Sequence, residues 1–280
     1  MLARFSELLA DATASRGAAV GAFTCYNLEQ AAGVLRAAEV RGAGVVILVT
    51  EKSFAGHDGP LLMSALVAAA ERSRAFACVQ LDHVSDLALI ESAFSLGAGA
   101  VLADGSHLPF EENVALVAAA AAGGEVEAEL AGIAGDEDVA TAQSAGAYTD
   151  PELARRLVER TRAACLAVSI GNVHGVYREP PQLDWDRLAA LRASADCPLA
   201  LHGASGLSDA DVRRAIELGI AKVNVYTELR ERYLAVTAER IDAARDGLRL
   251  LDLNAAQTDA IADVAGAKLD LCLGEPGGQP

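Results

Sequence analysis

Residues 75–83 read Ala-Phe-Ala-Cys-Val-Gln-Leu-Asp-His, an apolar run that ends in a carboxylate and an imidazole. Its length and composition are typical of a buried strand. Neighbouring side chains in a strand point to opposite faces, but where the strand stops, both Asp82 and His83 can turn toward one pocket. Four later apolar runs also end in an acid–base or metal-ligand residue, and these are Asp104, Glu129, His174 and His202. The repetition indicates that several strand ends contribute to one site.

Short apolar runs alternate with helical patterns rich in Ala, Leu, Arg and Glu along the chain. The eight expected strands are Ala18–Thr24, Val45–Thr50, Ala75–Leu81, Ala100–Ala103, Glu125–Leu130, Leu166–Ser169, Leu199–Leu201 and Lys222–Val225. The helices expected to follow them are Leu28–Arg41, Leu61–Arg72, Asp86–Leu96, Phe110–Ala122, Pro151–Arg162, Trp185–Ala193, Asp209–Leu218 and Glu228–Asp246. Because both faces of such strands must be buried, the pattern predicts an α/β fold in which the strands close into a (β/α)8 TIM barrel.

Two further helices and two irregular segments complete the predicted organisation. A leading helix at about Leu2–Thr13 is expected to close the bottom of the barrel, and a last helix at about Ala255–Cys272 follows the eighth unit. Residues 1–273 are predicted to form a single domain, and the polar Gly/Pro tail 274–280 to be disordered. The connection between Leu130 and Pro151, about twenty residues without a clear period, predicts a lid or a disordered segment.

The composition excludes several classes of partner. The 280-residue chain carries a formal charge of −16, which argues against nucleic acid and anionic membranes. It has no apolar run of about 18 residues, and Glu7 and Asp11 interrupt the stretch that a signal peptide would need. The five cysteines are scattered and never form a Cys-X-X-Cys pair, as expected of reduced, mostly buried thiols. We therefore expect a cytoplasmic protein that acts on a small molecule.

The polar strand ends define a candidate metal site. In such a barrel the carboxyl ends of the strands form the active face, where the acidic and imidazole residues named above would meet. Three imidazoles that leave one position open are typical of catalytic Zn²⁺. Each histidine alone would more often be structural, but the joint placement of three at strand ends favours a metal site. His57 is expected to be an ordinary loop histidine, and His107 to border the site without binding the metal.

Two segments that contain glycine or hydroxyl residues predict an anion site. Residues 202–206 read His-Gly-Ala-Ser-Gly and lead into the helix expected at Asp209, and residues 224–227 read Asn-Val-Tyr-Thr after the eighth strand. Backbone N–H groups near a helix start favour phosphate, and the loops after strands seven and eight are the usual phosphate site of this fold. The alternative is a pair of ordinary tight turns.

The long connection also carries an acidic patch, Gly135-Asp136-Glu137-Asp138. Alone, it would be interpreted as a solvated run of charges. A carboxylate on a mobile lid can, however, enter a site with the substrate and move a proton. Both interpretations stay open at this point.

Together these segments resemble the class II, metal-dependent ketose-bisphosphate aldolases of the tagatose and fructose type. The resemblance extends from about Phe5 to Val236. The matching segments are Leu81–His83, Asp104–Asn113, Glu127–Leu130, Gly171–Tyr177, His202–Gly206 and Asn224–Thr227. The resemblance implies a lyase that reversibly cleaves a ketose (bis)phosphate to dihydroxyacetone phosphate and an aldehyde, and that forms a homodimer or homotetramer.

The resemblance also implies metal-binding and acid–base residues. Those implied to hold the catalytic Zn²⁺ are His83, His174 and His202. Those implied at a second or alternative position, for a divalent or monovalent cation, are Asp104 and Glu129. Asp82 would move the proton of the C4 hydroxyl, and Glu137 would handle the proton at the ketone carbon.

A further set of residues is implied to bind phosphate. The residues at the phosphate of dihydroxyacetone phosphate would be Gly175, Gly203, Ala204, Ser205, Asn224, Val225, Tyr226 and Thr227. Thr50 would face the phosphate on the aldehyde side, and Arg178 favours a retained phosphate site.

Two positions depart from the family pattern. Thr24 stands where Asn is common, and Tyr226 stands where related enzymes keep Asp or a small residue beside the substrate carbons. These departures leave open an aldolase of the same mechanism with a changed aldehyde substrate. A catalytically silent homologue that binds a metal and a sugar phosphate is the other alternative. A Schiff-base route is disfavoured because Lys222 lies early in the eighth strand, away from the active rim.

Overall fold

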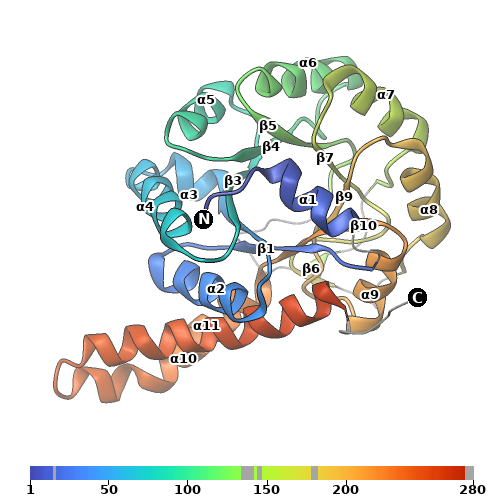
Figure 1. Ribbon diagram of the computed structural model, residues 1–280. Helices are drawn as coiled ribbons and strands as arrows, with labels where there is room; N and C mark the ends of the chain where they lie inside the picture. Colours follow the sequence, from blue (N-terminus) through green and yellow to red (C-terminus); the bar gives the residue numbers. More distant parts are fainter. Residues whose placement is uncertain (15–16, 134–141, 144–146, 178–181, 275–280) are drawn as a thin grey trace.

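A closed barrel of parallel strands forms the centre of the computed structural model (Figure 1), which describes residues 1–14, 17–133, 142–143, 147–177 and 182–274. The strand order around the barrel is β1-β10-β9-β7-β5-β4-β3-β2. The strands are β1 Val20–Thr24, β2 Val45–Thr50, β3 Ala77–Val84, β4 Ala100–Asp104, β5 Glu125–Glu129, β7 Cys165–Ala167, β9 Leu199–Leu201 and β10 Ile220–Val225. The predicted eight-stranded barrel is confirmed, and no strand end differs from its prediction by more than three residues.

The predicted helices surround the barrel. They are α2 Leu28–Arg41, α4 Gly59–Arg72, α5 Leu87–Ser95, α6 Phe110–Ala121, α7 Pro151–Thr161, α8 Trp185–Ser194, α9 Asp209–Glu217 and α10 Thr227–Arg245. The short helix α3, Glu51–Ala55, was not predicted, because five residues are too few to show a helical period. Ser208 caps α9 by accepting a hydrogen bond from the backbone N–H of Asp211.

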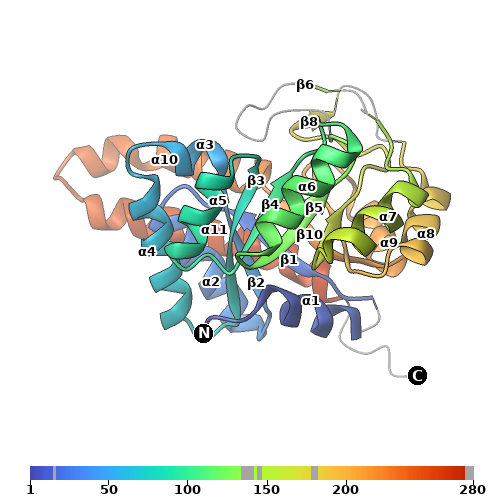
Figure 2. The same ribbon diagram turned by 90° about the horizontal axis from the view of Figure 1, so that it is seen from above.

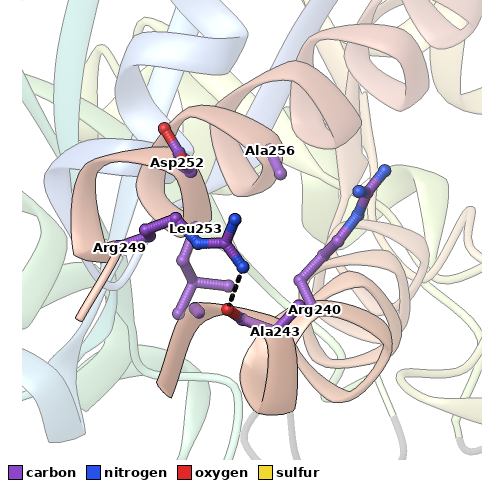
Figure 3. Close-up of a pocket in the computed structure, with 7 residues that line it drawn as sticks. Arg240, Ala243, Arg249, Asp252, Leu253 and Ala256 are labelled. Carbon is purple, nitrogen blue, oxygen red and sulfur yellow. Dashed lines mark hydrogen bonds between the residues drawn. The ribbon is translucent and has the colours of Figure 1, made fainter. Parts of the chain in front are cut away.

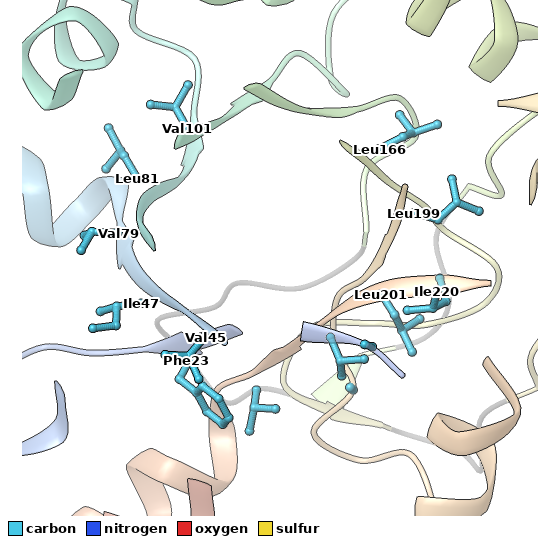
Figure 4. Packing of buried hydrophobic residues seen from close by; sticks show 14 of the residues in the cluster. Phe23, Val45, Ile47, Val79, Leu81, Val101, Leu166, Leu199, Leu201 and Ile220 are labelled. Carbon is cyan, nitrogen blue, oxygen red and sulfur yellow. The ribbon is translucent and has the colours of Figure 1, made fainter. Parts of the chain in front are cut away.

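Two hydrophobic clusters fill the space on either side of the strands. The larger lies between the barrel and the surrounding helices, and Figure 4 shows part of it, including Ile47 and Val79. The smaller lies inside the barrel, where Phe5 and Leu9 of α1 (Phe5–Ala14) pack with strand residues such as Leu48. Helix α1 therefore closes one end of the barrel, as predicted. Figure 2 shows it at the end opposite to two short strands, β6 (Ala142–Gln143) and β8 (Val176–Tyr177).

The last two helices form a hairpin that extends away from the barrel (Figure 1). Helix α11 spans Leu250–Leu273 and packs against both α2 and α10. It begins five residues before the predicted start at Ala255, because Leu250 and Leu251 are exposed and give no buried-face pattern. A pocket of about 150 Å³ between α10 and α11 is lined by Arg240, Arg249 and other residues of the hairpin (Figure 3). This pocket contains none of the predicted site residues.

The long connection contributes one ordered feature. Strand β6, Ala142–Gln143, pairs in parallel with β8, Val176–Tyr177. The predicted lid falls largely on residues 134–141 and 144–146, and most of the predicted tail on residues 275–280, all of which lie outside the described residues. Within the described part of the chain, none of the helices combines the length and the apolar character needed to cross a membrane.

Candidate active site

Asp82 and His83 reach the same side of the barrel wall because β3 is irregular at this point. The strand does not stop at Leu81, as the sequence suggested, but continues to Val84. Its pairing with β4 shifts between Leu81 and Val84, and His83 has a φ of +49°. A bulge adds one residue to a strand and redirects the side chains around it, at a backbone cost of about 1 kcal/mol for a residue in the left-handed region. Two consecutive polar residues can therefore serve one site.

Three imidazoles converge at the carboxyl end of the barrel, His83 from β3, His174 from the loop after β7 and His202 from the end of β9. The ring centroid of His83 lies 5.0 Å from that of His174 and 4.9 Å from that of His202. One nitrogen from each ring lies within 4.8 Å of the others, and His83 Nε2 lies 3.0 Å from His202 Nδ1. Two nitrogens on one tetrahedral Zn²⁺ lie about 3.3 Å apart, so this donor set fits a shared cation.

The burial of His202 also suits metal binding. Burial lowers the pKa of this imidazole, although the neighbouring Glu127 carboxylate opposes the shift. The lowered pKa keeps the ring neutral near pH 7, which is the form that binds a cation.

Two carboxylates form a second candidate group around His83. Asp104 Oδ2 lies 2.9 Å from His83 Nδ1, and Glu129 Oε2 lies 3.4 Å from the same nitrogen. Burial raises the pKa of Glu129 to about 8, and the nearby Asp104 adds to the shift. Burial of Asp104 would raise its pKa, but the hydrogen bond to His83 holds that pKa well below its usual range. His83, Asp104 and Glu129 can together offer a cation one nitrogen and two carboxylate oxygens.

The loops that carry His174 and His202 are packed directly on each other. Asn172 donates a hydrogen bond of 3.0 Å to the backbone oxygen of His202. Gly203 has a φ of +62°, and a Cβ at this position would lie 1.9 Å from the backbone oxygen of Val173. Only glycine permits this approach without displacing backbone. The contact helps to bring the two imidazoles together.

The loops after β9 and β10 meet at Ser205, inside the predicted phosphate segments. Ser205 Oγ accepts hydrogen bonds of 3.2 Å from the backbone N–H groups of Tyr226 and Thr227, where α10 begins. The hydroxyl of Thr227 is buried and has no hydrogen-bond partner among the described residues. A buried hydroxyl in this position is suited to an incoming oxygen ligand. The other members of the predicted set, Gly175, Ala204 and Val225, are buried in the same region.

A polar aromatic cluster, formed by Tyr26, Tyr226 and Arg230, lies beside these loops. The two phenol oxygens are 2.8 Å apart, and Arg230 donates to the Tyr226 oxygen at 2.7 Å. The guanidinium also lies 4.7 Å from the centre of the Tyr226 ring. The sequence analysis missed Tyr26 and Arg230. A usable signal was that Tyr26 follows β1 and Tyr226 follows β10, which are neighbours in any closed barrel.

A buried polar network under the histidines was also missed. Glu127 Oε1 lies 2.9 Å from His202 Nε2, and its Oε2 lies 2.8 Å from Lys222 Nζ. Burial alone would lower the pKa of Lys222, but the carboxylates of Glu127 and Asp82 raise it above its usual range. The signal was the spacing, since Gln80–Asp82, Glu127–Glu129 and Lys222–Asn224 each place two polar residues on one face of a strand.

The remaining predicted residues have different surroundings. Thr50 ends β2 beside Asp82 and caps α3 by accepting from the backbone N–H of Ser53. His57 and His107 are exposed, and neither belongs to the candidate metal groups found among the described residues. Glu137 and Arg178 lie outside the described residues.

Comparison with known proteins places this site in a family context. Residues 3–275 match the family model described as class II fructose-bisphosphate aldolase. The YdjI aldolase from Escherichia coli K12 is 33% identical, with 97% of each chain covered and a TM-score of 0.85. A proposed fructose-1,6-biphosphate aldolase from Coccidioides immitis is 30% identical, with 96% of this chain and 95% of that chain covered and a TM-score of 0.87. A fructose-bisphosphate aldolase from Campylobacter jejuni shares the fold, with a TM-score of 0.80. It is 18% identical, with 97% of this chain and 96% of that chain covered.

Proposed function

The chain belongs to the class II fructose-bisphosphate aldolase family and is an aldolase, a carbon–carbon lyase, and we propose that it reversibly cleaves a ketose phosphate to dihydroxyacetone phosphate and an aldehyde. The observation that carries this proposal is the convergence of three imidazoles on one position next to the buried carboxylate of Asp82. A protein that only bound sugar phosphates would need no such acid–base group, which favours the aldolase over a silent homologue.

We propose that His83, His174 and His202 hold one Zn²⁺. Asp104 and Glu129 would serve a second or alternative cation position on the other side of His83. When bound, the cation would act as a Lewis acid that polarises the C2 carbonyl of the ketose.

The proposed proton transfers belong to two carboxylates. Asp82 is fully buried, and Asn224 donates to its Oδ2 at 3.4 Å, which orients the carboxylate in the site. In this position it would accept the proton of the C4 hydroxyl as the C3–C4 bond breaks. Glu137 would return a proton to carbon from the long connection after β5.

The phosphate of dihydroxyacetone phosphate would bind at the loops after β9 and β10. Ser205 and Thr227 would supply hydroxyls, and the first turn of α10 would supply backbone N–H groups beyond those of Tyr226 and Thr227, which already donate to Ser205 Oγ. Thr50 and Arg178 remain proposed contacts of a phosphate on the aldehyde side.

Removal and return of the metal tests the main proposal. Chelation of the purified enzyme should abolish cleavage of fructose and tagatose 1,6-bisphosphates, and Zn²⁺ should restore it. His174→Ala should bind less than the wild-type amount of zinc and show no restoration. Cleavage that persists in protein shown by elemental analysis to be metal-free would refute the proposal.

A second candidate is an aldolase with a changed aldehyde substrate. The hydrogen-bonded pair of Tyr26 and Tyr226 beside Arg230 supports it, because two phenols and a guanidinium can bind polar groups that a small residue cannot reach. Dihydroxyacetone phosphate should be condensed with a panel of aldehydes by wild type and by Tyr226→Phe, which keeps the ring and removes the hydroxyl. A best rate with glyceraldehyde 3-phosphate in both proteins would exclude this candidate.

A further inference from the structure

Beneath the histidine cluster, four polar side chains form one connected chain of contacts. Gln80 Nε2 and Lys222 Nζ lie 2.9 Å and 2.8 Å from Glu127 Oε2. Glu127 Oε1 lies 2.9 Å from His202 Nε2. All four residues have an exposed fraction of 0%. Both oxygens of Glu127 are therefore fixed, one by Gln80 and Lys222 and the other by His202.

The geometry points to Glu127 and Lys222 as positioning residues that together fix the ring orientation and tautomer of His202 toward the proposed metal. This inference rests on the proposed function. An ionised carboxylate can only accept a hydrogen bond, so the hydrogen of His202 lies on Nε2, and Nδ1 keeps its lone pair. Nδ1 is the nitrogen that faces His83 Nε2 at 3.0 Å. A carboxylate behind a histidine is a known means of orienting a metal ligand.

Lys222 acts through Glu127 and has no access to substrate. Its ammonium balances the charge of the buried carboxylate and holds Oε2 in place. It also donates to Asn224 Oδ1 at 2.8 Å, and Asn224 Nδ2 in turn lies 3.4 Å from Asp82 Oδ2 and 3.3 Å from His202 Nδ1. The lysine thus connects the histidine and the acid–base carboxylate through one rigid network.

Four variants test this role in the full-length protein: Glu127→Gln, Lys222→Met, the double variant and Gln257→Met. The last is the control, because Gln257 is buried between α10 and α11, where it donates to Thr237 and can be removed at a cost in stability alone. Zn²⁺ affinity would be measured on metal-free protein by competition with a chromophoric chelator, and ligand geometry from the visible spectrum after Co²⁺ is added. The low-field N–H proton resonance of His202 would report the tautomer without any metal.

Glu127→Gln should weaken Zn²⁺ binding by about 10- to 100-fold, the usual effect of losing the group behind a ligand. It should also remove the low-field resonance and alter the Co²⁺ spectrum. The double variant should be more stable than either single variant, because both charges of the Glu127–Lys222 pair are removed together, yet its Zn²⁺ affinity should remain low. Gln257→Met should keep the wild-type affinity.

Recovery of both stability and affinity in the double variant would overturn the inference, since the network would then be merely structural. Unchanged affinity in Glu127→Gln, with tight binding by wild type, would overturn the inference and leave the proposed function intact. A wild-type protein that binds no Zn²⁺ would overturn both. Should Glu127→Gln fail to fold, the double variant carries the same comparison, because it does not leave Lys222 buried without Glu127.

Discussion

The contact between Gly203 and Val173 predicts a large effect from one added methyl group. An alanine Cβ would lie 1.9 Å from the backbone oxygen of Val173, so the two loops would have to move apart by about 1 Å to reach a tolerable contact. The φ of +62° adds a cost of about 1–2 kcal/mol for a non-glycine residue, and overpacking adds about 1–3 kcal/mol. We expect Gly203→Ala to lose roughly 3–4 kcal/mol of stability.

Gly42 provides a matched control for the backbone conformation. Its φ is +63°, but a Cβ there would meet no atom within 4 Å. Gly42→Ala should therefore lose only about 1–2 kcal/mol, from the left-handed conformation alone. The difference between the two variants isolates the close approach of the two loops.

Thermal unfolding followed by circular dichroism, at one scan rate, would measure both variants. At about 2–4 °C per kcal/mol, Gly203→Ala should lower the apparent Tm by roughly 10 °C and Gly42→Ala by a few degrees. Because the displaced loops carry His174 and His202, Gly203→Ala should also lose most of its zinc affinity, and Gly42→Ala should keep it. Equal losses of Tm in the two variants, with zinc binding intact in both, would refute the reasoning.

Three further predictions follow from buried groups. Burial, together with Asp104, raises the pKa of Glu129 to about 8 from an ordinary value of 4.5, so the folded metal-free protein retains a proton that the unfolded chain releases between these values. The free energy of unfolding of the metal-free protein should therefore fall as the pH rises from about 4.5 to about 8. In Glu129→Gln this decrease should be smaller, as measured by urea titrations at a series of pH values. Because Lys222 is buried and ion-paired, borohydride reduction with dihydroxyacetone phosphate should give no adduct in mass spectrometry, and a modified Lys222 would contradict the mechanism. All five cysteines are buried, so a thiol reagent should label only a trace of them until the protein is denatured, and rapid labelling of the native protein would contradict the described core.

The fold was predictable because each strand and helix has its own local signal. The run Val45–Thr50 is fully buried on both faces, and its uninterrupted apolar sequence indicated this directly. The bounds of helix α2 were predicted to the residue, and in the structure Asn27 and Gly42 cap its two ends. The start of α11 was predicted five residues too late. Leu250 and Leu251 are apolar but exposed, so the first turn of this helix lacks the alternation of buried and exposed residues that marks a helix in a sequence.

The convergence of His83, His174 and His202 was predictable from the sequence, but the backbone geometry that produces it was not. Asp82 and His83 were expected to share a pocket because the strand ends, whereas the strand continues and a shift in pairing turns His83. Such a shift depends on the neighbouring strand and leaves no trace in a single segment. Tyr26 was missed because its partner Tyr226 lies 200 residues away, and the two meet only through the pairing of β1 with β10 in the closed barrel.

The buried pair of Lys222 and Glu127 is difficult to explain by stability alone. Removing two charges from water costs several kcal/mol for each ion, and their mutual attraction usually only offsets this cost. A well-packed apolar pair of similar volume is often as stable or more so, and the rest of the barrel interior near α1 is built in that way, from residues such as Leu9 and Val46. The charged pair instead occurs where Glu127 contacts the ring of His202. We therefore infer that Lys222 is present in the barrel interior because it helps to orient the imidazole of His202, and not because it stabilises the barrel.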